Sequence, residues 1–429
     1  MWTKIIKYLS SKDVYGSLTL VNKRFQSLAI GSGVLRMIKV VDHDIIHDYF
    51  KEKTLNILTH SKAPIKLVCE ISEWNYNIFE VISMAQNLKH LVLQKTPEKT
   101  DGNIIFEWPP KISKGDEFSM KFLDAFKHSK LEHLELEGYF VDPNAMIEIT
   151  KIKTLKTFRI SNSGDITISI TPEVVNAFAQ NENQLEHIEF DDFNVNFFWR
   201  EPLATKEESN ELITALNNLL NRKSNAMKSL KYITWDGTGN HYSSNFPLTN
   251  LRLCQNLDEF CGQLQPHDIE ILAELPRLQK LKLRQLENPK YLLDNLNFDS
   301  LKYLSLTGTF ETDSIICQEL RKHNFPVLER LHIHVFDSDV VGLDEDLFLN
   351  LMSNATKLKS ISISSHPYII FPLSDQFMYN FFKNSNIFVS FKNKSFEEFC
   401  IEKDPIVFRK YNRMKKSFAN WSSNNPEYS

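Results

Sequence analysis

The side chains of this 429-residue chain that could carry acid–base or metal chemistry are few and widely separated. His332 and His334 alternate along one predicted strand, but no carboxylate or thiol lies beside them at metal-ligand spacing. Asp191 and Asp192 are adjacent, so on a strand they point to opposite faces and cannot pair as general acid and base. The glycines of residues 236–240 are more typical of a turn than of a phosphate-binding loop. We therefore expect no catalytic residue, no metal site and no cofactor.

Cysteine usage and charge narrow the class of protein further. The cysteines are odd in number and scattered, without a Cys-x-x-Cys pair, so we interpret them as reduced core thiols. They are Cys69, Cys254, Cys261, Cys317 and Cys400. The 50 Lys and Arg residues against 54 Asp and Glu residues give a net charge of -4, which disfavours nucleic-acid binding. No run of about 18 apolar residues occurs, so we expect no membrane contact and a cytoplasmic or nuclear location.

A Leu-x-x-Leu-x-Leu phrase, with other apolar residues in some positions, recurs along most of the chain. Within each phrase the fourth and sixth positions alternate with polar residues, which predicts a short strand that buries these two positions. Weaker copies of the phrase bring the total to about thirteen. The clean copies begin at Leu88, Leu131, Leu155, Leu185, Leu230, Leu278, Leu301, Leu328 and Leu358, and the weaker ones lie near residues 35–40, 65–69, 257–260 and 387–391.

The segments between the phrases show helical periodicity of apolar residues. Asp268 and Asp344 precede two of these segments as candidate N-caps. Asp142-Pro143 and Thr171-Pro172 each combine a capping residue with proline at the first helical position. Each repeat is therefore predicted to be a strand followed by a helix. Because a helix is bulkier than a strand, stacking such units predicts an α/β horseshoe with parallel strands on its concave face.

These features resemble the leucine-rich-repeat family, whose consensus is matched in its first six positions from about residue 35 to residue 391. The resemblance implies a solenoid over residues 34–394. Two long intervals between phrases predict insertions near residues 95–116 and 193–208. The aromatic side chains of these insertions either contact a partner or fill a gap between repeats. Residues 395–429 contain a basic stretch and are predicted to form a C-terminal cap and tail.

Residues 1–33 precede the repeat, and their apolar residues at helical spacing predict short helices that cannot bury their apolar faces alone. Residues 18–29, Leu-Thr-Leu-Val-Asn-Lys-Arg-Phe-Gln-Ser-Leu-Ala, resemble the Leu-Val-x-Lys-Arg-Trp/Phe-x-x-Leu-Ala stretch of the F-box family. The Leu-Pro pair with which F-boxes usually open is not matched, so we expect an F-box that is incomplete at its N-terminus. The alternative is a helical cap that shields the end of the repeat array.

An F-box followed by leucine-rich repeats resembles the substrate receptors of Skp–cullin–F-box ubiquitin ligases. The resemblance implies a subunit that is not itself an enzyme, docks a Skp-type adaptor and through it a cullin, and binds a client protein with its repeats. The adaptor-facing apolar side chains implied by this resemblance are Trp2, Ile5, Leu9, Val14, Leu18 and Val21. The alternative is a repeat scaffold or inhibitor with no connection to a ligase.

The outward-facing strand residues are expected to line the concave face, where their charges segregate along the sequence. The N-terminal half is expected to be acidic, through Glu135, Glu137, Glu189 and Asp191. The C-terminal half is expected to be basic and rich in hydroxyls, through Lys280, Lys282, Arg284, Tyr303, Arg330, His332 and His334. We hypothesise that the C-terminal half binds an acidic or phosphorylated client segment, with Arg284 and Arg330 as bidentate donors. Alternatively, these charges only pair locally and keep the strand surface soluble.

Overall fold

The computed structural model divides into two compact units, unit 1 over residues 1–254 and unit 2 over residues 255–429. Each unit is described by itself, for the residues whose placement is defined. These residues are 37–41, 65–71, 88–95, 111–112, 124, 130–137, 140–141, 143–161, 171–193, 206–234, 248–262, 266–283, 288–307, 313–335, 344–365, 375–384 and 388–390.

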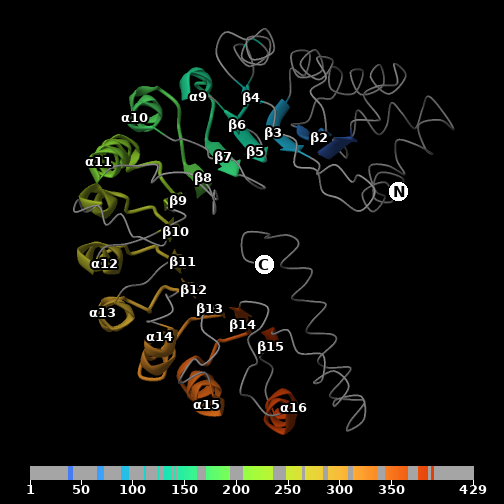
Figure 1. Cartoon of the computed structure of the whole chain (residues 1–429), viewed down its shortest axis with the longest axis vertical. Helices are drawn as coiled ribbons and strands as arrows, with labels where there is room; N and C mark the ends of the chain where they lie inside the picture. The colour runs from blue at the N-terminus through green and yellow to red at the C-terminus, as the bar shows by residue number, and fades with distance from the viewer. Residues whose placement is uncertain are drawn as a thin grey trace, which may run out of the picture. The chain divides into compact units, whose positions relative to one another are not determined.

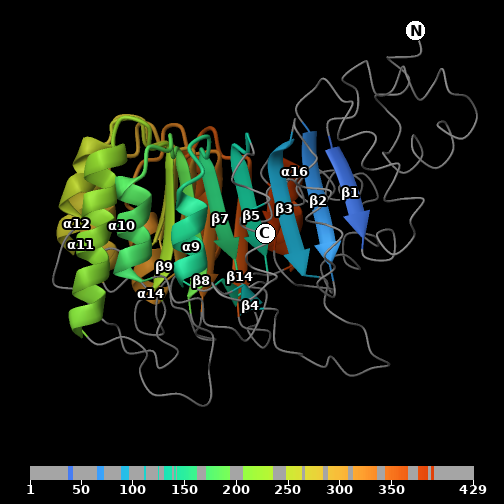
Figure 2. The same ribbon diagram turned by 90° about the horizontal axis from the view of Figure 1, so that it is seen from above.

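Unit 1 contains a parallel sheet in the strand order β1-β2-β3-β5-β7-β8-β9, so its neighbouring strands follow one another along the chain. Two short strands, β4 and β6, pair separately and are also parallel. Figure 2 shows β1, β2 and β3 side by side with their arrowheads pointing the same way. The strands are β1 (Met37–Val41), β2 (Ile65–Ile71), β3 (Leu88–Lys95), β4 (Lys111–Ile112), β5 (His133–Glu137), β6 (Phe140–Val141), β7 (Thr157–Ser161), β8 (His187–Phe193) and β9 (Ser229–Thr234).

Unit 2 repeats the same arrangement, with parallel strands in the order β10-β11-β12-β13-β14-β15. Parallel strands that follow directly along the chain require a crossover segment between them, and the intervening helices supply it. The strands are β10 (Glu259–Gly262), β11 (Lys280–Leu283), β12 (Tyr303–Thr307), β13 (Arg330–Val335), β14 (Ser360–Ser365) and β15 (Phe388–Ser390).

The helices alternate with the strands, and within each unit the labelled helices lie on one side of the strands (Figure 1). Neighbouring helices pack on one another along the array. The sequence prediction of an α/β fold with parallel strands and alternating helices is therefore confirmed. The helices are α9 (Pro143–Thr150), α10 (Pro172–Gln180), α11 (Lys206–Lys223), the 3-10 helix η2 (Thr249–Leu253), α12 (Pro266–Ala273), α13 (Pro289–Asn295), α14 (Asp313–Leu320), α15 (Glu345–Asn354) and α16 (Asp375–Asn384).

The fourth and sixth positions of the phrase form the core between strands and helices. In β5, Leu134 and Leu136 are buried, whereas the alternating positions are partly exposed. Aromatic residues fill the same role in the next repeats: the ring of Phe158 in β7 lies 5.0 Å from Phe178 in α10 and 6.3 Å from Phe190 in β8, measured between centroids. Each repeat therefore buries its apolar face against its own helix and its neighbours, which a single repeat could not do.

The predicted N-terminal capping residues of the helices are confirmed in part. Asp344 caps α15 as expected, because its Oδ1 accepts a hydrogen bond of 3.2 Å from the Leu347 backbone N–H. Thr171 precedes α10, and Pro172 takes the first helical position, but Thr171 makes no side-chain capping bond to the helix. Asp268 is not a cap: α12 begins at Pro266, so Asp268 is buried inside its first turn. A proline two residues earlier starts the helix sooner because its fixed φ already suits a helix.

The phrase predicted at Leu230 lies three residues earlier in the structure. Leu230 is aligned with Ile188 across β8 and β9, so it occupies the fourth position of its phrase and not the first. Met227, which is fully buried, takes the first position. The sequence reading failed because Leu-x-x-Ile-x-Trp at residue 230 satisfies the pattern as well as Met-x-x-Leu-x-Tyr does. The correction changes which side chains of β9 face outward, and Lys231 becomes one of them.

The cysteine prediction is confirmed for the four cysteines within the described ranges, Cys69, Cys254, Cys261 and Cys317, which are buried and free. Burial raises the pKa of the Cys254 and Cys317 thiols to about 12, so neither is a thiolate near neutral pH. Cys400 lies outside the described residues. In the part of the chain that the structure describes, no helix is long and apolar enough to cross a bilayer.

Candidate functional site

The register of the parallel strands arranges the polar phrase positions in rows that cross each sheet. In the repeat that begins at Leu131, Glu132 is the second position, His133 the third and Glu135 the fifth. Because neighbouring strands pair residue for residue, the same position in successive repeats lies side by side. We call these the second-position, third-position and fifth-position rows. The third and fifth positions alternate with the buried fourth and sixth positions, so their rows lie on the face of the sheet turned away from its described helices. The second position directly precedes the strand.

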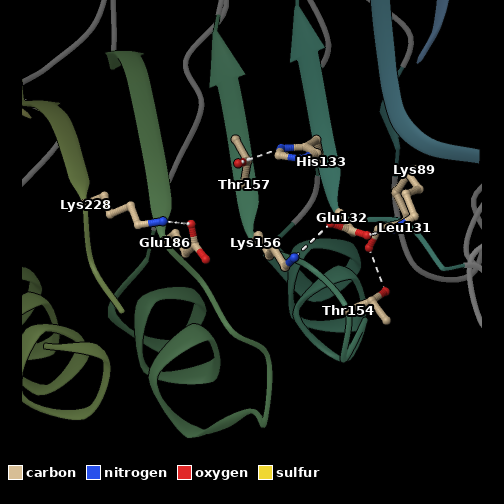
Figure 3. A network of polar contacts seen from close by, with 9 residues as sticks. All are labelled: Lys89, Leu131, Glu132, His133, Thr154, Lys156, Thr157, Glu186 and Lys228. Atoms are coloured by element: carbon tan, nitrogen blue, oxygen red, sulfur yellow. Dashed lines mark hydrogen bonds and ion pairs between the residues drawn. The ribbon is translucent and has the colours of Figure 1, made fainter. Parts of the chain in front are cut away.

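The second-position row of unit 1 alternates in charge from one repeat to the next, as Figure 3 shows. Glu132 accepts hydrogen bonds from Lys89 on one side and from Lys156, at 2.9 Å, on the other. The hydrogen bonds from Lys89 and then Lys156 lower the pKa of Glu132 to about 2. The next carboxylate, Glu186, accepts a hydrogen bond of 2.6 Å from Lys228, which lowers its pKa as well. This row is a ladder of ion pairs between repeats.

The fifth-position row of unit 1 is also a charge ladder, but a more deeply buried one. Glu189 in β8 lies between two cations, with its Oε2 3.1 Å from Nε of Arg159 and its Oε1 2.5 Å from Nζ of Lys231. The Glu189 and Lys231 side chains are only 10% and 6% exposed. Glu135 is aligned with Arg159 across β5 and β7. The expectation of an acidic N-terminal half is therefore wrong for these strands, because Arg159 and Lys231 alternate with the carboxylates.

A group of imidazoles and hydroxyls forms the third-position row of unit 1. The His90 and His133 rings lie 5.1 Å apart between centroids, and Nδ1 of His133 is 2.8 Å from Oγ1 of Thr157 (Figure 3). Burial and the charge of His90 lower the pKa of His133. Nε2 of His90 is 2.8 Å from Oε1 of Glu135. Burial raises the pKa of Glu135, but this hydrogen bond and the His90 charge outweigh it, so the net pKa is lowered. The row is held by contacts within unit 1.

Unit 2 fills the same positions with different chemistry. Its third-position row is Glu259, Lys280, Tyr303, Arg330 and Ser360, and its fifth-position row is Cys261, Lys282, Ser305, His332 and Ser362. The Lys280 ammonium lies 3.3 Å from the Glu259 carboxylate. Tyr303 and Ser305 are buried in this structure. The two rows therefore contain three cations, one carboxylate and several hydroxyls.

The electrostatics of the unit 2 rows differ from those that a simple count of basic residues suggests. Burial, followed by the charges of Lys282 and His334, lowers the pKa of His332 to about 4, so this imidazole is neutral at pH 7. Burial also lowers the pKa of Arg330 and raises that of Tyr303. The positive charge of these rows at neutral pH therefore comes from Lys280, Lys282 and Arg330, not from His332.

The structure brings together most of the client-binding residues predicted in the C-terminal half. The client-binding residues predicted in the N-terminal half lie on strands that are not adjacent. Lys280, Lys282, Tyr303, Arg330, His332 and His334 lie on three adjacent strands, β11 to β13. Glu135 and Glu137 in β5 are separated from Glu189 and Asp191 in β8 by β7. Two groups of predicted residues fall outside the described residues. These are Arg284 and the six adaptor residues Trp2, Ile5, Leu9, Val14, Leu18 and Val21.

Sequence reasoning missed three charged residues of the rows, Arg159, Lys231 and Glu259. Arg159 occupies the fifth position of the clean copy at Leu155, so reading every copy at the same position would have found it. Lys231 was hidden by the three-residue error in register. Glu259 belongs to a weak copy, and its role as the partner of Lys280 depends on which strands are adjacent.

No protein-family model matches the chain, and no curated protein matches it. Among solved structures, one described as "Crystal structure of TLR13-ssRNA13 complex" shares 13% sequence identity over 79% of this chain, with a TM-score of 0.23. The aligned part spans 63% of the length of that chain. At this TM-score the similarity carries no argument about the present protein.

Proposed function

We propose that this protein is a leucine-rich-repeat client receptor, in which the polar face of the unit 2 sheet binds a protein client and residues 1–33 dock a Skp-type adaptor of a cullin ubiquitin ligase. The observation that carries the proposal is the in-register display of Lys280 and Lys282 on β11 and of Arg330 on β13, on either side of β12 and on the face turned away from the described helices. Such rows present side chains at a regular spacing, which suits recognition of an extended polypeptide.

The chemistry of this face favours a client segment with negative charge. Lys280 and Arg330 flank Tyr303 in the third-position row. Lys282 lies two residues after Lys280 in β11, in the fifth-position row. Arginine binds carboxylate and phosphate in a bidentate manner, and serine hydroxyls supply further hydrogen bonds. Ser360 and Ser362 lie on the next strand, β14, beside Arg330 and His332. An acidic or phosphorylated segment is therefore the client chemistry that we propose.

The adaptor-docking part of the proposal rests on the F-box resemblance of residues 1–33, which lie outside the described residues. In this role the protein performs no bond chemistry itself. It raises the effective concentration of the client near the ubiquitin-transfer machinery, so the rate of transfer depends on proximity and orientation.

Co-expression of the full chain with a Skp-type adaptor tests the ligase connection. We expect a 1:1 complex on size exclusion, because the apolar residues of the F-box-like segment would be covered by the adaptor. Leu9→Asp and Leu18→Asp should abolish the complex, whereas Lys153→Asp, a change at an exposed ion pair of unit 1, should leave it intact.

The alternative is a repeat scaffold or inhibitor whose first helices only cap the array. The ion-paired rows of unit 1 are the observation that favours it, because they show that charged rows in this fold also serve to join repeats. A full chain that elutes alone in the presence of excess adaptor would support the scaffold and contradict the ligase connection.

A further inference from the structure

Three potential metal ligands from two consecutive repeats of unit 2 meet at the ends of helices. Asp294 lies in the last turn of α13, Glu319 lies in the last turn of α14, and His323 lies in the connection after α14. One ligand atom from each residue lies within 4.8 Å of the other two. Nε2 of His323 and Oδ1 of Asp294 are 3.5 Å apart. These residues lie in the helices and connections of the repeat and not in the strands that carry the polar rows.

Two of these ligand-type atoms are buried and make no hydrogen bond, although Nε2 of His323 has the long contact with Asp294 given above. Within the described ranges, Oε2 of Glu319 and Nε2 of His323 have no hydrogen-bond partner. The Glu319 side chain is only 7% exposed, so water does not readily replace the missing partner. Buried polar atoms without partners are rare in native proteins, because each costs free energy of desolvation. Two such atoms at one place, both metal-ligand types, call for a shared partner with positive charge.

The nearby lysine satisfies only part of this need. Nζ of Lys322 lies 2.7 Å from Oε1 of Glu319, and the lysine side chain is 61% exposed. This contact leaves Oε2 of the same carboxylate without a donor. Lys322 also makes no hydrogen bond to Nε2 of His323, so the imidazole nitrogen stays without a hydrogen-bond partner. The ammonium is therefore a competitor for one oxygen and not a substitute for an ion at the cluster.

The geometry and the donor set fit a small divalent ion. Zinc bonds of about 2.0–2.1 Å in a tetrahedron place neighbouring ligand atoms about 3.4 Å apart, close to the 3.5 Å between Asp294 and His323. Two carboxylates and one imidazole suit first-row divalent metals, and this combination is one that zinc accepts with water as a fourth ligand. Asp294 is 46% exposed, which provides an entry path and room for that water.

Aromatic packing fixes the imidazole in position. The ring of His323 lies 5.8 Å from the ring of Phe298, which in turn packs edge-on against Phe325 at 4.7 Å, measured between centroids. Phe325 is fully buried, so this stack anchors the connection after α14 to the core. A ligand held by packing loses little conformational freedom when it binds an ion, and this favours binding.

We propose that Asp294, Glu319 and His323 bind one divalent transition-metal ion, for which Zn²⁺ is the best fit, and that the ion joins the ends of α13 and α14. The ion supplies the partner that Oε2 of Glu319 and Nε2 of His323 need. It links two successive repeats of unit 2 at their helix ends, as ion pairs link the repeats of unit 1 at the start of their strands.

Zinc titration of the full chain after treatment with EDTA tests the proposal. We expect isothermal titration calorimetry to show about one tight site per chain and the thermal unfolding midpoint to rise with Zn²⁺. Asp294→Asn and His323→Asn should each weaken this site by at least about tenfold. Asp299→Asn, a matched change at an exposed aspartate a few residues beyond Asp294, should leave the affinity unchanged.

A variant that is expected to bind zinc more tightly separates loss of the site from a folding defect, because misfolding would not raise the affinity. Lys322→Met removes the ammonium that competes for Glu319, so the zinc affinity should rise several-fold. Co²⁺ added in place of Zn²⁺ should give visible absorption bands that His323→Asn removes. Zinc binding of unchanged affinity in both Asp294→Asn and His323→Asn, or a Lys322→Met variant that binds no more tightly, would overturn the proposal.

Discussion

The two units place different chemistry at equivalent positions of the same repeat. In unit 1 the fifth-position row alternates Glu135, Arg159, Glu189 and Lys231, and ion pairs join its neighbouring strands. In unit 2 the same row contains Lys282, Ser305, His332 and Ser362, with a neutral imidazole near its centre. A row of outward-facing polar residues is therefore not by itself a binding surface. In unit 1 it joins repeats, and in unit 2 we propose that it binds a client segment.

The largest expected effect comes from Glu189→Ala in unit 1. The change leaves Lys231, which is 6% exposed, and Arg159 without their shared carboxylate. Removing one partner of a buried ion pair costs about 3–5 kcal/mol, and we expect a loss of unfolding free energy in this range. Chemical denaturation followed by circular dichroism measures it.

Two variants control this experiment. Glu186→Ala breaks a pair in which Lys228 is 46% exposed, so it should cost less than about 1 kcal/mol. The double variant Glu189→Leu, Lys231→Met replaces both charges with apolar groups and should recover most of the lost stability. Equal losses for Glu189→Ala and Glu186→Ala would show that the two rows of unit 1 do not differ in burial as described.

The next effect is a dependence on pH in unit 2. The pKa of His332 is about 4 in the folded protein and about 6.5 when unfolded, so the unfolded state binds the proton more readily between these values. The contribution of the neutral His332 to the free energy of unfolding is therefore fully present above pH 6.5. It is lost as the pH falls toward 4, by up to about 3 kcal/mol. His332→Gln should remove this part of the acid destabilisation, measured as the difference between the two unfolding curves from pH 7 to pH 4.

Unit 1 should respond in a lower pH window. The folded pKa of Glu132 is about 2, below its ordinary value of 4.5, so its contribution is present above pH 4.5 and is lost as the pH falls toward 2. Glu132→Gln should therefore lower the stability above pH 4.5, and its difference from the parent chain should disappear between pH 4.5 and pH 2. The difference between His332→Gln and the parent chain should instead develop between pH 6.5 and pH 4. The same pH window for both variants would contradict the assignment of these charges.

A smaller difference in the loss of unfolding free energy is expected for the polar contacts at helix ends in the two units. Lys223 at the end of α11 is buried and donates hydrogen bonds of 2.6 Å and 2.8 Å to the carbonyl oxygens of Asn181 and Asn183. Lys223→Met leaves both carbonyls without this donor and should cost about 2 kcal/mol. In unit 2, Arg321→Met breaks the pair with Asp344, whose side chain is 45% exposed, and should cost about 1 kcal/mol or less. A larger loss for the unit 2 variant would reverse the comparison.

The fold was predictable from sequence wherever a repeat position must be apolar. Leu134, Leu281 and Leu304 each take a buried position that the phrase predicts, because an α/β repeat buries alternate strand residues. The register at Leu230 was not predictable from the pattern, since methionine at residue 227 is as suitable for a buried position as leucine. Only the alignment with β8 distinguishes the two registers.

The site was predictable in part, and the reason is the distance along the chain between paired charges. The sequence identified Lys280, Lys282 and Arg330 as outward-facing, but the pairing of Glu189 with Lys231 joins residues 42 positions apart. The low pKa of His332 depends on burial, which cannot be deduced from the sequence of its own strand. The cluster of Asp294, Glu319 and His323 combines the end of α14 and the connection after it with a residue from the preceding repeat, so no local motif predicts it.

The binding of a degenerate phosphoserine-peptide library to the full chain tests the central claim most directly, because that claim assigns recognition to the unit 2 face. We predict enrichment of phosphorylated and acidic peptides, and loss of this enrichment when Lys280→Glu, Lys282→Glu and Arg330→Glu are combined. The Glu189→Leu, Lys231→Met variant of unit 1 should bind the same peptides as the parent chain. Enrichment that survives the unit 2 charge reversals, or that is lost with the unit 1 variant instead, would contradict the account.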